Sequence, residues 1–240
     1  MSLHPNNGAD RGGGTTTFSA LSALPPRDSS ALANSVRDRL RMAIVLGEIP
    51  SGVRLNQVQV AAQLGVSRMP VRVASADLVV EGLLEPLATG GVAVRRLSNE
   101  DVTAAYRVRE ALEAQAVRDV AQARPEAALA ELNEILKRHA ELGGVNDIHT
   151  LLELDREFHG TILESTDNPF YGRAMVPMWS VVERAMVGML EVVPDMFDLA
   201  WRQHRQIVEA LTAGDADLAE QRAREHIRNA ADSFTHTDHD

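Results

Sequence analysis

The sequence predicts a mainly α-helical protein in two parts: an N-terminal winged helix-turn-helix with a small β-hairpin wing, then a C-terminal bundle of six to seven helices. Two observations predict this fold class. Apolar residues recur every three or four positions along most of the chain from residue 32 onward, which is the spacing of amphipathic helices. Two short apolar runs on either side of Gly90-Gly91 interrupt that pattern, as expected for a hairpin.

Composition limits the class of protein. The 240-residue chain is 45% apolar, enough to fill one large core or two small ones. Cysteine is absent, which excludes disulfides, thiolate nucleophiles and zinc sites built from cysteine. The chain contains no run of about 18 apolar residues, and it does not begin with the basic and apolar regions of an export signal. We therefore expect a soluble, cytoplasmic protein with no membrane contact.

Charge is divided unevenly along the chain, whose formal net charge is -10. Residues 1–98 contain 10 arginines and 7 acidic residues, a net charge of +3. Residues 99–240 contain 14 basic and 27 acidic residues, a net charge of -13. The two parts are therefore expected to meet different partners.

The N-terminal residues contain a tail and a first helix. Residues 1–30 are rich in Gly, Ser, Thr, Asn and Pro and are expected to be disordered, because they hold too few apolar residues to bury a face. Apolar residues then repeat at helical spacing over residues 32–45, until Pro50-Ser51-Gly52 ends the pattern. This spacing predicts the first helix.

A turn and a third helix follow the short second helix. The second helix is predicted over Gln57 to Leu64 and ends at Gly65, which adopts the left-handed conformation without steric cost. Ser67 then caps the third helix, and its hydroxyl is expected to accept the N–H of Met69. Pro70 lies in the first turn, where its missing donor costs nothing.

The first domain is expected to end with a hairpin, after which the sequence consists of long amphipathic segments. Residues 83–87 and 92–94 are the two predicted extended runs of the wing. Ser98 and Asp101 resemble a helix-capping pair and open the helical half. We therefore expect a winged helix-turn-helix domain over residues 31–97 and an all-helical domain over residues 98–240. The helical segments of the second domain are predicted near residues 99–122, 126–142, 147–165, 170–190, 196–213 and 215–234.

One side of the predicted third helix carries two arginines, Arg68 and Arg72, four residues apart. An arginine at a helix N-terminus can bind a phosphate, or pair with the O6 and N7 atoms of guanine. The alternative is that both arginines only solvate a surface helix. The ordered context of turn, cap and wing favours nucleic-acid binding. The inward side of the same helix is expected to consist of Val71, Ala74, Ser75 and Leu78.

These residues carry a family resemblance over about residues 29–95. The stretch "RLNQVQVAAQLGVSRMPVR", followed by "LVVEGLLEPLATGGVAV", is similar to the winged-helix domain of GntR-type bacterial transcription regulators. The resemblance implies DNA contacts by a serine and two arginines of the third helix, with the glycines of the wing tip approaching the minor groove. The residues concerned are Ser67, Arg68, Arg72, Gly90 and Gly91.

The chain departs from the family pattern inside the third helix. Val73 stands where the family commonly has an acid, Ser75 replaces a core leucine, and Ala76 and Asp77 replace two basic residues. These changes remove phosphate contacts, so we expect modest and strongly salt-dependent DNA affinity. They also leave the operator sequence open.

Histidines on apolar helix faces form the second constellation. Asp155 and His159 are four residues apart and share a helix face, whereas His204 and His226 lie on the apolar faces of two later helices. A lone buried histidine is usually a hydrogen-bonded core residue. Four such groups together instead favour a divalent cation, because three imidazoles and a carboxylate suit Zn, Ni, Co or Mn and leave positions open for a ligand.

The C-terminal half resembles the FadR-like branch of the GntR group, whose effector domain (FCD-type) is an all-helical bundle. The matching stretches include "YRVREALEAQAV", "DREFH", "DNPF", "QHRQIVEAL" and "GDADLAEQRAREH". The resemblance implies that Asp155, His159, His204 and His226 bind a metal, and that a small carboxylic acid effector binds to that metal with Arg109 as a second anchor. Arg109 has an alternative interpretation, an ion pair with Glu113 on the helix surface.

The leading hypothesis is a ligand-responsive transcription regulator of the repressor type and not an enzyme. A homodimer would place two recognition helices about one turn apart on a palindromic operator in double-stranded DNA. One alternative is a metalloenzyme that activates water at the three-histidine, one-carboxylate site. Another is a regulator for which the metal itself is the signal.

Overall fold

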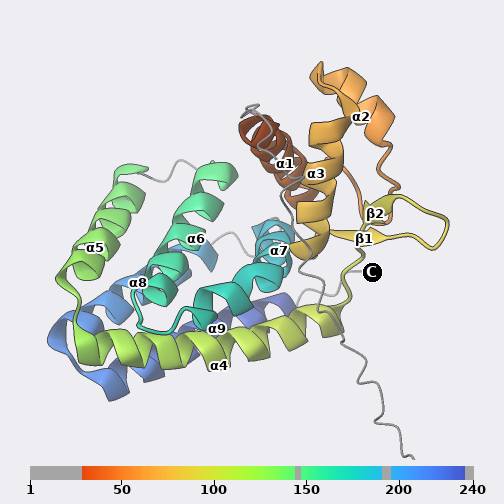
Figure 1. Ribbon diagram of the computed structural model, residues 1–240. Coiled ribbons are helices and arrows are strands. Elements are labelled where there is room, and N and C mark those ends of the chain that lie inside the picture. The colour runs from red at the N-terminus through yellow and green to blue at the C-terminus, as the bar shows by residue number, and fades with distance from the viewer. Residues whose placement is uncertain (1–28, 144–146, 191–195, 236–240) are drawn as a thin grey trace, which may run out of the picture.

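The computed structural model describes residues 29–143, 147–190 and 196–235, and it has the predicted architecture (Figure 1). A small unit of three helices and a hairpin stands on one end of a larger bundle of helices. The tail predicted over residues 1–30 lies outside the described residues, apart from its last two residues, which begin α1. The elements are α1 (Ser29–Val45), α2 (Gln57–Leu64), α3 (Arg68–Val80), β1 (Leu84–Pro86), β2 (Val92–Val94), α4 (Asn99–Ala123), α5 (Glu126–Glu141), α6 (Ile148–Glu164), α7 (Phe170–Leu190), α8 (Met196–Ala213) and α9 (Ala216–Thr235).

The core of the N-terminal unit lies between α1 and α3, which pack against each other. On α3 the predicted inward residues are all buried, and Val71, Ala74 and Leu78 are fully so. Ser75 is the polar member of this face, and its hydroxyl donates to the Val71 carbonyl oxygen at 2.7 Å. A core serine is therefore tolerated here because its hydrogen bond is made inside the helix. The α1 side of the core is formed by Ala33, Val36, Leu40, Ile44 and Val45.

The turn between α2 and α3 is fixed by its caps. The Asn56 side chain accepts the N–H groups of Val58 and Gln59 at the start of α2, and Gly65 ends the helix at a φ of +66°, as predicted. Ser67 occupies the N-cap position of α3 with extended backbone, but its hydroxyl makes no capping hydrogen bond. The predicted bond to Met69 is therefore wrong, and the Ser67 hydroxyl is exposed and free of such a bond.

The wing is an antiparallel hairpin, as predicted, with Leu84 opposite Val94. Its tip contains Gly90 and Gly91, with φ values of +83° and +82° that side chains with a Cβ rarely adopt. The Arg54 guanidinium donates to the Gly90 carbonyl oxygen at 2.9 Å and ties the tip to the strand-like residues before α2. The tip is therefore held against its own domain.

Six helices, α4 to α9, form the C-terminal bundle in the described part of the chain. The predicted capping pair is present at its start: the Ser98 hydroxyl accepts the Asp101 N–H, and the Asp101 carboxylate accepts the Ser98 N–H. Helix α4 runs along α9 at the base of the bundle (Figure 1). Among the described residues, no helix has the length and apolarity needed to cross a membrane.

Helix α7 joins the two units through charged and polar contacts. Glu183 pairs with Arg41 of α1, and Arg184 donates to the Arg95 carbonyl oxygen at 2.9 Å and to the Ser51 hydroxyl at 2.8 Å. A cleft of about 570 Å³ opens beside this joint and is lined by charged side chains of both units. These polar contacts lie beside a continuous apolar core, because the buried apolar residues of both units belong to one cluster.

Two glycines allow a matched test of the fold. We expect Gly65→Ala to lower the free energy of unfolding by about 1–2 kcal/mol, because a Cβ is strained at its positive φ although no atom lies near the added methyl. Gly160→Ala, within α6, is expected to raise the free energy of unfolding by about 0.5–1 kcal/mol, because alanine favours a helix and the methyl again meets nothing. Urea unfolding followed by circular dichroism measures both. Equal effects of the two substitutions would contradict the assigned backbone conformations.

Candidate metal centre and nucleic-acid interface

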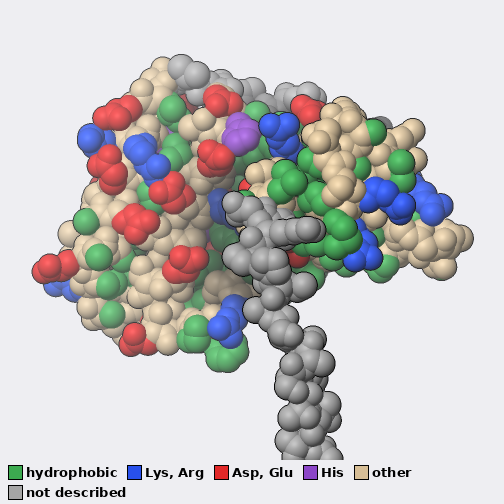
Figure 2. All heavy atoms as spheres, turned by 45° about the horizontal axis from the view of Figure 1, so that its top comes forward, with side chains coloured by type: hydrophobic (Ala, Val, Ile, Leu, Met, Phe, Trp, Pro, Cys, Tyr) green, Lys and Arg blue, Asp and Glu red, His purple; other side chains and the backbone are tan. Residues whose placement is uncertain are grey.

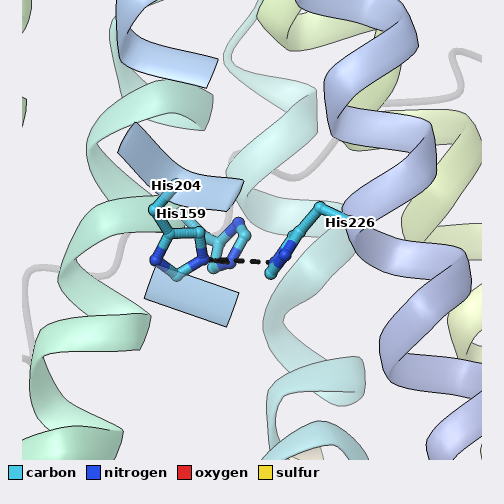
Figure 3. A group of neighbouring side chains, drawn as sticks. All are labelled: His159, His204 and His226. Carbon is cyan, nitrogen blue, oxygen red and sulfur yellow. Dashed lines mark hydrogen bonds between the residues drawn. The ribbon is translucent and has the colours of Figure 1, made fainter. Parts of the chain in front are cut away.

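Three histidines from three helices converge inside the bundle (Figure 3). His159 lies on α6, His204 on α8 and His226 on α9, and all three are buried. The Nε2 atom of His204 lies 3.2 Å from the Nε2 atom of His159 and 3.2 Å from that of His226. The predicted histidine constellation is therefore brought together at one point.

Hydrogen bonds from the Nδ1 atoms of His159 and His226 set the orientation of these two rings. The Nδ1 atom of His159 donates to the Glu113 carboxylate at 2.6 Å, and the Nδ1 atom of His226 donates to the Gln203 side-chain oxygen at 3.1 Å. A carboxylate or a carbonyl oxygen can only accept, so each Nδ1 carries the proton. The Nε2 lone pairs of these two rings then point towards the centre, where a cation would be the natural partner.

Burial favours the neutral form of two of the rings, His204 and His226. Burial, together with the neighbouring imidazoles, lowers the pKa of His204 well below its ordinary value, and burial lowers that of His226 similarly. Neutral imidazole is the form that binds a metal. The Nδ1 atom of His204 is buried and has no hydrogen-bond partner within the described residues.

Asp155 lies beside the histidines, one helical turn before His159. Its Oδ1 atom is 3.7 Å from the Nε2 atoms of both His159 and His204. At this distance the carboxylate makes no direct hydrogen bond to the rings, but it adds negative charge beside their nitrogens. The four predicted ligands thus lie together, and three of them, the histidines, could hold a metal ion as they stand.

Arg109 is buried beside this cluster and pairs with Glu113. Its Nε atom donates to the Glu113 carboxylate at 2.6 Å, with both side chains almost fully covered. The pair predicted from the spacing therefore exists, but it lies in the interior and not on the helix surface. The Nη2 atom of Arg109 has no partner among the described residues, which leaves one edge of the guanidinium free to bind.

Glu113 lies between two positive or proton-donating groups. Burial alone would raise its pKa, but the Arg109 guanidinium and the His159 ring outweigh that effect and lower the pKa to about 2. Burial by itself would lower the pKa of Arg109, and the nearby carboxylates of Glu113 and Asp155 raise it instead. Glu113 is therefore an ionised carboxylate that orients His159, a role the sequence analysis missed.

The candidate nucleic-acid interface is the outer side of α3. Ser67, Arg68 and Arg72 are all exposed, as predicted. Neither arginine forms an ion pair or a side-chain hydrogen bond with the part of the chain that the structure describes. Figure 2 shows basic and hydrophobic side chains over the right-hand lobe, which contains α2, α3 and the wing, whereas acidic side chains predominate on the other lobe.

The wing tip adds a further exposed cation. Gly90 and Gly91 are exposed, and Arg54 lies within 4 Å of the position a Cβ of Gly91 would take. The sequence analysis missed Arg54, because only the fold brings it next to the tip. The helix N-terminus and the wing therefore both present free or exposed positive groups.

Comparisons with known proteins identify a family for each part of the chain. Residues 32–94 match the family model "Bacterial regulatory proteins, gntR family", and residues 104–229 match the model of the FCD domain. The "Probable D-xylose utilization operon transcriptional repressor" of Paenarthrobacter nicotinovorans is 32% identical over 82% of this chain and 86% of its own length. The "HTH-type transcriptional repressor RspR" of Escherichia coli (strain K12) is 26% identical over 81% of this chain and 85% of its own length.

A solved structure has the same fold. McbR/YncC of Escherichia coli superimposes with a TM-score of 0.73 over 85% of this chain and 97% of its own, at 22% sequence identity. The two family models together cover the winged helix and most of the bundle, and the relatives are regulators of transcription, not enzymes. The chain therefore belongs to the GntR family of bacterial regulatory proteins, in the branch with an FCD effector domain, and is a ligand-responsive transcription regulator.

Proposed function

We propose that the protein is a cytoplasmic, homodimeric repressor that binds a palindromic operator and is controlled by a small carboxylic acid bound at a metal in the bundle. One observation carries the proposal: the same chain holds an exposed, unpaired arginine pair at a helix start and a buried cluster of three histidines. The first group suits an anionic duplex, and the second suits a cation that binds an acid. The repressor assignment is supported by the two relatives that are named as repressors.

The proposed DNA contacts come from the start of α3 and from the wing. Arg68 and Arg72 can pair with guanine or phosphate in the major groove, and the free Ser67 hydroxyl can bind a phosphate. Gly90 and Gly91, which have no side chain to obstruct, would let the wing backbone approach the minor groove. A dimer would repeat these contacts on the second half-site of the palindrome.

The proposed metal ligands are Asp155, His159, His204 and His226. The inward Nε2 lone pairs and the nearby carboxylate form a mixed nitrogen and oxygen donor set that suits Zn, Ni, Co or Mn. When bound, such an ion would supply positive charge for the carboxylate of an effector. Arg109 would be a second anchor for that acid, because its free Nη2 edge is buried close to the cluster.

Helix α7 is the proposed connection between the two sites. Trp179 lies next to both the cluster and the anchor, with its ring 6.3 Å from that of His159 and 5.9 Å from the Arg109 guanidinium carbon. One turn further along, Glu183 and Arg184 contact the DNA-binding unit. An effector that displaces α7 would change the positions of the two α3 helices, with an expected coupling free energy of about 1–3 kcal/mol.

A regulator that senses the metal alone is the second candidate. It is favoured by the spacing of the nitrogens: the His204 Nε2 atom lies 3.2 Å from each of the other two, close to the separation of about 3.3 Å that two nitrogens have on one tetrahedral zinc ion, so a metal could bind here without an acid. Titration of operator binding with metal, in the absence of any organic acid, separates the candidates. Full control by the metal alone would replace the acid-responsive proposal.

The metal centre is tested with two histidine variants. We expect the full-length protein to bind about one zinc ion per chain, and His204→Ala to lower zinc affinity at least tenfold, because it removes the ring that bridges the other two. His149→Ala, on the exposed start of α6, is the matched control and should bind zinc like the wild type. Competition with a fluorescent chelator and elemental analysis measure both. Unchanged zinc binding by His204→Ala would refute the centre.

The acid site is tested by thermal shift of the zinc-loaded protein with a panel of small carboxylic acids. A stabilising acid should bind at least tenfold more weakly to Arg109→Lys, which keeps the charge that faces Glu113 but loses the free guanidinium edge. Stabilisation should also be lost in Asp155→Ala. Arg107→Lys, exposed on the same helix, should behave like the wild type. Stabilisation that is equal in all variants would place the acid elsewhere.

The DNA interface is tested with operator selected from a random duplex library. Arg68→Ala and Arg72→Ala should each weaken binding by about 1–3 kcal/mol and relax base preference if they pair with guanine. Arg173→Ala, an exposed arginine of α7, should leave binding unchanged. Fluorescence anisotropy at several salt concentrations gives the affinities and the salt dependence. Full affinity of the double variant Arg68→Ala/Arg72→Ala would exclude α3 as the reading helix.

A further inference from the structure

Two large apolar side chains lie exposed on the outer side of α3, beside the arginine pair. Met69 is 54% exposed and Val73 is 42% exposed. They are four residues apart, so they form a row along the helix that runs next to the row formed by Arg68 and Arg72. No other part of the described chain covers this face.

The position of the apolar row limits what can occupy it. Single exposed apolar residues are common on proteins and need no partner. Here, however, two of them lie one turn apart at the start of the helix, next to two guanidiniums without ion pairs. A partner must therefore offer negative charge and small apolar groups side by side. The major groove of duplex DNA meets this requirement, because negative phosphates flank it and its floor carries base acceptor atoms and methyl groups.

The groove offers one apolar group, the 5-methyl of thymine, next to the acceptor atoms of guanine. The methyl group suits the side chains of methionine and valine, and the guanine acceptors suit arginine. Further along the same helix Asp77 is half-buried, and its carboxylate disfavours a close approach of phosphates. The contact with bases is therefore confined to the first two turns of α3. Val80, which is 71% exposed at the last turn, lies beyond it.

We propose that Met69 and Val73 read thymine methyl groups in the operator, next to guanines bound by Arg68 and Arg72. This inference rests on the DNA-binding function proposed above and deepens it by naming the bases. A valine at position 73 adds a methyl-reading surface where an acidic side chain would repel the duplex. The half-site should therefore contain thymine close to guanine.

The test uses the full-length protein and operators selected from a random duplex library. Each selected thymine is replaced by deoxyuracil, which pairs in the same way and lacks only the methyl group. For the wild type, one or two such replacements should weaken binding about fourfold each, the effect of about 0.8 kcal/mol for one buried methyl group. The double variant Met69→Ala/Val73→Ala should bind the thymine and uracil operators equally.

Val80→Ala is the matched control, because it removes a still more exposed valine from the same helix outside the expected contact. It should keep the wild-type sensitivity to uracil. Tolerance of uracil at every position, or sensitivity retained by the double variant, would overturn the inference while DNA binding stands. Failure to enrich any sequence would instead overturn the DNA-binding function itself.

A second copy of the chain is the other apolar partner that the face could meet. Sedimentation of the free protein distinguishes this case. Met69→Ala/Val73→Ala should sediment like the wild type. A change of oligomeric state in this variant, and not in Val80→Ala, would assign the face to contact between copies and overturn the inference.

Discussion

The buried carboxylate of Glu113 is the group on which the helical half of the protein depends. It pairs with Arg109 on its own helix and accepts the Nδ1 proton of His159 from α6. A charge in an apolar interior is stable only when such partners offset the lost hydration, so these contacts hold α4 and α6 in one relative position. They also turn the His159 Nε2 atom towards His204. The interaction that stabilises the core is therefore the same one that shapes the candidate metal centre, and neither could be altered alone.

Helix α7 contacts both the candidate metal centre and the winged helix. Its Trp179 ring packs near His159, and its Glu183 carboxylate, one turn on, contacts Arg41 of α1 and Arg156 of α6. Burial raises the pKa of Glu183, and the two arginines only partly offset this effect. The buried apolar residues of both units belong to one continuous cluster, so a movement of α7 would be felt by the packing of the winged helix as well as by these ion pairs.

Helix boundaries could be predicted closely because glycine, proline and capping residues punctuate the chain; α2 has the predicted bounds, and Gly65 the predicted conformation. The three histidines of the candidate metal centre could be found because histidine on an apolar stripe is unusual. The remaining features depend on contacts between distant segments. The spacing alone predicts that Glu113 pairs with Arg109 on the helix surface. Only the packing of α6 against α4 shows that the pair is buried. Whether Ser67 caps its helix depends on a hydroxyl rotamer, which no residue pattern specifies.

The uneven charge of the chain gives the proposed dimer its sensitivity. The half that follows residue 98 carries a net charge of -13, which repels a duplex, so we expect DNA to approach the face of α3 that bears Arg68 and Arg72, and the wing. That face is small, and Asp77 restricts it further. Each unit alone should therefore bind weakly, and in the proposed dimer firm binding would require both units to engage at once. When two weak contacts must form together, the DNA affinity falls sharply if the spacing between them changes slightly. A shift of α7 would move Glu183, which pairs with Arg41 of one unit and Arg156 of the other, and would thereby produce such a change.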